Sequence, residues 1–72
     1  MLDYVTDGRD EYRVIYAHFQ TFSLAVAQVR EVGDEGDWYR ITKRRFPSRH
    51  LATAWGQWFL EHQMLISSTD EA

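Results

Sequence analysis

Basic residues are concentrated in one short part of this 72-residue chain, between residues 40 and 50. Cations at this spacing can contact phosphates or an acidic protein surface, and neighbouring aromatic side chains can stack on bases. A solvated edge strand that resists aggregation shows the same pattern. The candidate partner-binding cations, which we call the basic strip, are Arg40, Lys43, Arg44, Arg45 and Arg49.

The remainder of the chain is acidic, because it holds three basic residues and all eleven carboxylates, and the formal net charge is −3. These carboxylates would repel a nucleic-acid duplex at long range, which favours an acidic protein over nucleic acid as the partner of the basic strip. Acidic residues cluster near Asp7 and in residues 34–37. The cluster at residues 34–37 is too short for a twelve-residue calcium loop. We interpret this cluster, and the one near Asp7, as solvated loops.

Motifs for catalysis and metal binding are absent from the sequence. The chain has no cysteine, which excludes disulfides and thiolate metal sites. His18, His50 and His62 do not have the spacing of metal ligands. Because neither a nucleophile elbow nor a glycine-rich phosphate loop occurs, we expect a non-enzymatic protein with no catalytic residue, metal or cofactor.

Turn residues and periodicity predict the elements that position the basic strip. Two extended runs flank Asp7-Gly8, a favourable hairpin turn. Residues 22–32 fit either a helix or a strand. We favour the helix slightly, because no Gly, Pro, Asn or Asp between residues 11 and 31 could form a tight turn. A further strand at residues 38–46 should end at Pro47.

An amphipathic helix is expected after Ser48, a plausible N-cap. We expect one helix face to dock on the sheet and the opposite face to be exposed, where a partner or a second copy of the chain could bind. The docking face is Leu51, Trp55, Trp58, Phe59, His62 and Leu65, and the exposed face includes Thr53, with Gly56, Leu60 and Met64 as candidate partner-binding residues.

The sequence therefore predicts an α+β fold, with a small, mainly antiparallel β-sheet and a C-terminal amphipathic helix packed on one face. We expect a single domain at residues 1–66 and a flexible tail at residues 67–72. No apolar run is long enough to span a membrane and no signal peptide is evident, so a cytoplasmic location is expected.

Two resemblances bear on function. A hairpin followed by the helix start "FPSRHLA", residues 46–52, is similar to the arm-type DNA-binding domains of phage integrases. In size, element order and charge segregation, the chain resembles small phage-encoded inhibitor proteins, including anti-CRISPR proteins and phage inhibitors of host polymerase. That resemblance implies a host nucleic-acid-processing machine as the partner. We expect a stoichiometric inhibitor or modulator of a larger host complex, with a nucleic-acid-binding accessory protein and a homodimer as alternatives.

Overall fold

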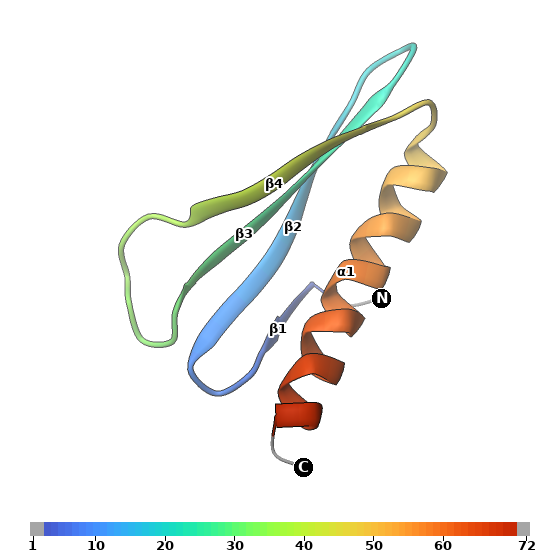
Figure 1. Ribbon diagram of the computed structural model, residues 1–72. Coiled ribbons are helices and arrows are strands. Elements are labelled where there is room, and N and C mark those ends of the chain that lie inside the picture. Colours follow the sequence, from blue (N-terminus) through green and yellow to red (C-terminus); the bar gives the residue numbers. More distant parts are fainter. Residues whose placement is uncertain (1–2, 71–72) are drawn as a thin grey trace.

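The computed structural model describes the backbone of residues 3–70 and the side chains of residues 3–63. It confirms the α+β fold: four antiparallel strands in the order β1-β2-β3-β4 form one sheet, and a single helix, α1, lies across one side of it (Figure 1). No helix among the described residues is long and apolar enough to cross a membrane.

The predicted Asp7-Gly8 turn is confirmed and connects β1 (Tyr4–Thr6) to β2 (Asp10–His18). Gly8 has a φ of 92°, which a residue with a side chain rarely adopts. The Asp7 carboxylate accepts hydrogen bonds from the backbone N–H groups of Arg9, at 2.9 Å, and Asp10, at 2.8 Å. Local chemistry therefore determines this turn.

The helix expected at residues 22–32 was wrong: residues 23–31 form β3 (Ser23–Glu31), which pairs with β2 along its whole length. A four-residue loop joins the strands, and in it the N–H of Phe19 donates to the carbonyl of Phe22 at 2.8 Å. The two phenylalanine rings stack with centroids 4.7 Å apart. No described residue other than glycine has a positive φ, so this turn does not need the residue types that the prediction required.

The predicted strand before Pro47 is confirmed as β4 (Tyr39–Phe46), which pairs with β3. The register shifts between Ala27, opposite Thr42, and Gln28, opposite Arg40. Ile41 is therefore the extra residue of a β-bulge.

Helix α1 (Arg49–Asp70) begins after Ser48, whose Oγ accepts the N–H of Leu51 at 3.3 Å and thereby confirms the N-cap. The backbone of α1 includes residues 67–70 of the expected tail. The face of α1 that packs on the sheet is only partly the expected one. Phe59 is buried and Trp55 packs against the core as expected, but Gly56 and Leu60, expected on the exposed face, are buried too. Leu51 and Trp58 are instead about half exposed, at 48% and 55%.

Small residues explain this orientation of α1. On β3, Ala25 and Ala27 are fully buried, and Ala52 of α1 is also fully buried. Gly56 lies against the ring of Tyr16, so closely that a Cβ there would be 2.8 Å from the Tyr16 Cζ. The helix therefore approaches the sheet through its smallest residues, which brings Phe59 and Leu60 into the core and leaves Leu51 and Trp58 about half exposed.

Candidate partner-binding face

Strand alternation divides the basic strip between the two sides of the sheet. Residues directly opposite each other on antiparallel strands point to the same face. Lys43 is opposite Val26, whereas Arg44 is opposite Ala25, which is buried beneath α1. Lys43 therefore belongs to the face without the helix, and Arg44 to the helix side, where its guanidinium group lies 5.9 Å from the Trp55 ring.

We define the open face as the side of the sheet that no described element covers. By the strand register it brings together three members of the basic strip and does not include Arg44 or Arg49, the first residue of α1. Its residues on β2, β3 and β4 are Glu11, Arg13, Ile15, Ala17, Leu24, Val26, Gln28, Arg30, Arg40, Lys43 and Arg45, and the register of β1 adds Tyr4 and Thr6.

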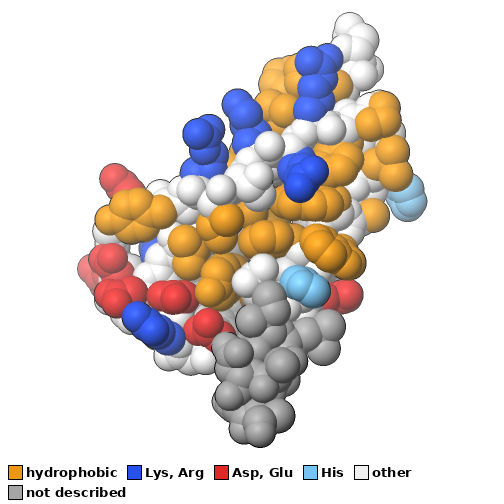
Figure 2. Space-filling view, in the orientation of Figure 1, with side chains coloured by type: hydrophobic (Ala, Val, Ile, Leu, Met, Phe, Trp, Pro, Cys, Tyr) orange, Lys and Arg blue, Asp and Glu red, His pale blue; other side chains and the backbone are white. Residues whose placement is uncertain are grey.

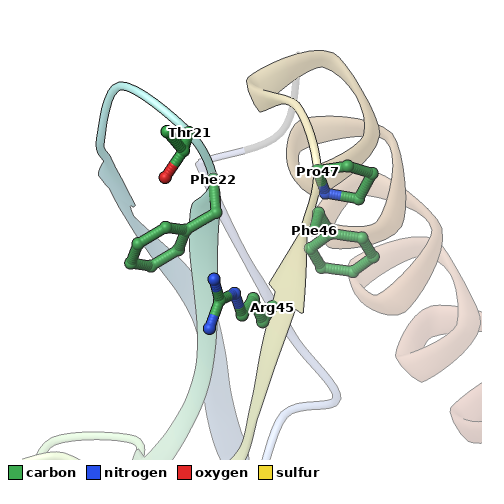
Figure 3. A pocket seen from close by; sticks show the side chains of 5 residues that line it. All are labelled: Thr21, Phe22, Arg45, Phe46 and Pro47. Atoms are coloured by element: carbon green, nitrogen blue, oxygen red, sulfur yellow. The ribbon is translucent and has the colours of Figure 1, made fainter.

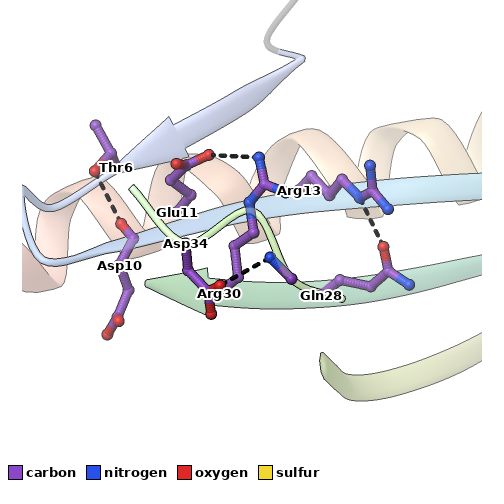
Figure 4. A network of polar contacts seen from close by, with 8 residues as sticks. Thr6, Asp10, Glu11, Arg13, Gln28, Arg30 and Asp34 are labelled. Carbon is purple, nitrogen blue, oxygen red and sulfur yellow. Dashed lines mark hydrogen bonds and ion pairs between the residues drawn. The ribbon is translucent and has the colours of Figure 1, made fainter. Parts of the chain in front are cut away.

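Arg13, Arg30 and Trp38 belong to the open face, although the sequence did not identify them as candidates. The guanidinium carbons of Arg13 and Arg30 lie 4.2 and 4.4 Å from the centroid of the Trp38 ring, within the range of cation–π contacts. Arg13 also donates from Nε to Gln28 at 2.7 Å, and Arg30 forms an ion pair with Glu11 at 3.7 Å (Figure 4). These contacts hold two cations and an aromatic ring in place.

Apolar side chains occupy the centre of the open face. Ile15 of β2 is opposite Val26 of β3, and Ala17 is opposite Leu24. Ile15 is 42% exposed, and Leu24 and Val26 are only partly covered. The open face thus has an apolar centre with basic residues on two sides of it. Arg13 of β2 and Arg30 of β3 lie on one side, and the basic residues of β4 lie on the other.

A shallow groove lies at the end of this face, between the β2–β3 loop and the end of β4. Its volume is about 380 Å³ (Figure 3). The guanidinium group of Arg45 lies 4.1 Å from the Phe22 ring and forms part of the lining. The lining residues are Thr21, Phe22, Arg45, Phe46 and Pro47.

Charge is segregated along the strands. Lys and Arg side chains lie along β4 as far as its junction with α1, and most of the Asp and Glu side chains in this view gather at the opposite end of the strands, where a Lys or Arg side chain also lies (Figure 2). The β1–β2 turn and the β3–β4 loop meet at the acidic end, where the N–H of Val32 donates to the carbonyl of Arg9. The protein therefore presents a basic end and an acidic end to a partner.

Several polar residues that could do chemistry instead have structural contacts. The Asp34 carboxylate accepts the N–H of Gly36 at 2.8 Å, and Nδ1 of His18 is 2.8 Å from the Ser23 hydroxyl. His62 stacks on Trp58 with ring centroids 5.0 Å apart. No group of three potential metal ligands occurs within the described residues.

The pKa shifts also have structural causes. The backbone N–H groups of Asp10 and Arg9 lower the pKa of Asp7, since they stabilise its ionised carboxylate. Burial raises the pKa of Tyr16, and a hydrogen bond with the Gln57 side chain opposes that shift. Burial is also the largest cause of the raised pKa of Tyr12.

The expectation that Gly56 and Leu60 lie on an exposed face of α1 was wrong. Leu60 is only 1% exposed, and Gly56 is covered by Tyr16, so neither residue is available to a partner in the folded protein. The side chain of Met64 lies outside the described residues. This correction removes the described part of the surface on which a homodimer was expected.

The chain matches no protein-family model, and no curated protein or solved structure matches it significantly.

Proposed function

We propose that this protein is a non-enzymatic binding protein that modulates a larger protein by stoichiometric binding through its open face. The observation that carries the proposal is the distribution of apolar residues on β3. Its helix side has Ser23, Ala25, Ala27 and Val29. Its open side has Gln28 and Arg30, but also two large aliphatic residues, Leu24 and Val26, which no described element covers. An antiparallel sheet with one face in water ordinarily places polar residues on that face.

The composition of the open face fits a protein partner. Protein interfaces have an apolar centre and a polar rim, and Arg and Trp are enriched in them. Here Ile15, Leu24 and Val26 form the centre, and basic residues lie on both sides. The matching partner surface would have an apolar centre with acidic residues around it. The proposal includes a larger host complex as the partner and its inhibition as the result of binding, as in small phage-encoded inhibitors.

Nucleic-acid binding through the same face is the second candidate. The contacts of Arg13 and Arg30 with Trp38, and of Arg45 with Phe22, favour it, because fixed cations and aromatic rings bind phosphates and bases. The open face has five cations, namely Arg13, Arg30, Arg40, Lys43 and Arg45. If each neutralised one phosphate of duplex DNA, a log–log plot of the binding constant against salt concentration would have a slope of roughly −4 to −5. The apolar centre and the acidic end of the molecule make a protein the better fit.

Two matched substitutions test the proposal. Ile15 and Leu51 are aliphatic residues of similar exposure, at 42% and 48%, but one lies on the open face and the other on α1. A tagged wild-type protein should retain one large protein from lysate after nuclease treatment and form a complex of fixed stoichiometry with it. Ile15→Glu should abolish that complex, whereas Leu51→Glu should preserve it.

Both variants must first show the thermal unfolding of a folded protein. The proposal fails if the wild type retains no protein, or if the two folded variants bind equally. Binding to purified duplex DNA or RNA with the stated salt slope, together with no retained protein after nuclease treatment, would establish the second candidate.

A further inference from the structure

The outer edge of β4 is a long strand edge that pairs with nothing else in the described part of the chain. The sheet order ends at β4, and β3 is its neighbour on the inner side. The strand has eight residues, compared with three in β1 at the other end of the sheet (Figure 1). A free edge of this kind exposes backbone N–H and C=O groups that can pair with another strand.

The charge of β4 determines which strands can pair with it. Lys43, Arg44 and Arg45 are consecutive and exposed. A second copy of β4 would bring these cations close to its own, and like charges across strands are destabilising. An extended acidic segment would instead place opposite charges beside them.

We propose that β4 pairs with an extended acidic segment of the partner, which adds a fifth strand to the sheet. This inference rests on the proposed function and specifies how the partner binds. Because Arg44 points to the helix side while Lys43 and Arg45 point to the open face, acidic residues at consecutive positions match all three cations. The added strand would continue the open face outward and end beside the groove near Pro47.

Capped synthetic peptides test strand addition on the wild-type protein. The first peptide has three consecutive glutamates between two Thr-Val-Thr segments. The second has the same sequence and charge, but alternate backbone nitrogens are methylated so that its pairing edge has no N–H donor. A third peptide has lysines in place of the glutamates.

We expect the unmethylated acidic peptide to bind in an NMR titration at low ionic strength and to slow amide exchange along β4. The methylated peptide should bind on the order of tenfold more weakly or not at all. The lysine peptide should not bind. Strand addition is refuted if the two acidic peptides bind equally, because binding would then depend on charge alone, or if the first peptide does not bind.

Substitution of Arg44 separates this inference from the proposed function. Arg44 does not lie on the open face, so a partner that binds only that face should tolerate Arg44→Glu, whereas strand addition predicts weaker peptide binding. Ile15→Glu, on the opposite side of β3 from the β4 edge, should leave peptide binding unchanged. If the acidic peptide does not bind, but Ile15→Glu still abolishes binding of the partner protein, the open-face proposal stands and strand addition is refuted.

Discussion

The contact between Gly56 and Tyr16 gives a prediction whose sign changes with the background. Replacing a glycine within a helix by alanine ordinarily stabilises a protein by about 1 kcal/mol. Here the new Cβ would overlap the Tyr16 hydroxyl and lie 2.8 Å from Cζ and 3.0 Å from Cε1. Overpacking of a core typically costs about 1–3 kcal/mol, and overlap with a ring held against the helix belongs near the upper end. We therefore expect Gly56→Ala to lower the free energy of unfolding by about 2 kcal/mol.

The Tyr16→Leu background isolates the cause of that loss, since leucine has no atoms at the positions of the tyrosine hydroxyl, Cζ or Cε1. In this background the overlap is removed and only the higher helix propensity of alanine over glycine remains. Gly56→Ala should therefore stabilise the protein by up to about 1 kcal/mol. The coupling between the two positions would then be about 3 kcal/mol, within the range for residues in direct contact.

Urea unfolding followed by far-UV circular dichroism measures all four proteins of this cycle. A change of 1 kcal/mol should shift the midpoint of thermal unfolding by about 4–8 °C in a domain of this size, which provides an independent measurement. If Gly56→Ala stabilises the wild type, or costs the same in both backgrounds, then α1 does not pack on Tyr16 through Gly56. In that case our assignment of the buried helix face is wrong.

Three further predictions concern the core and the first turn. Leu60→Ala should cost about 2–5 kcal/mol of folding free energy because Leu60 is 1% exposed; Leu51→Ala, at 48% exposure, should change it by less than about 0.5 kcal/mol in the same urea assay. Ser23→Ala should cost about 1 kcal/mol, because Ser23 is buried and hydrogen-bonded to His18; an unchanged unfolding midpoint would contradict this. Since folding lowers the pKa of Asp7, its charge stabilises the fold above its ordinary pKa of 3.8, and this contribution is lost as the pH falls through the folded pKa. Asp7→Asn should therefore be less stable than wild type at neutral pH and similar to it in strong acid; a difference independent of pH would contradict the assignment.

Local chemistry determines the parts of the fold that could be predicted from sequence. Asp7 and Gly8 form their turn through a carboxylate that accepts nearby N–H groups and a backbone with positive φ. Pro47 follows the last residue of β4, and Ser48 caps the helix. Each of these features depends on residues within a few positions of one another, so neighbouring sequence is sufficient to predict it.

The misassignment of β3 has a different physical origin. Its alternating valines and alanines satisfy a helical and an extended period almost equally, so the turn before it became the deciding feature. That turn uses ordinary backbone conformations and two stacked phenylalanines, Phe19 and Phe22, instead of glycine or proline. The pairing of β3 with β2 and β4 then determines its conformation, and neither contact can be read from the segment itself.

The candidate site was only partly predictable for the same reason. Strict alternation along residues 38–46 would already separate Arg44 from Lys43 and Arg45. It would also place Arg13 beside Ile15. The contacts of Arg13 and Arg30 with Trp38, however, join three separate segments of the chain. The helix expected at residues 22–32 concealed Arg30, because it removed the strand on which Arg30 aligns with Glu11.

The error in the helix face and the exposure of the open face have one cause. Sequence reasoning assigned the largest apolar residues of α1 to the sheet, because burial of area normally decides which face docks. This sheet presents Ala25 and Ala27 to the helix, so close approach through Ala52 and Gly56 buries Leu60 together with Phe59 and leaves Leu51 and Trp58 about half exposed. With one helix over its small residues, the sheet keeps Leu24 and Val26 on the side that no described element covers. An added strand beside β4 would extend that uncovered side, so partner binding would complete the layer that this short chain does not supply.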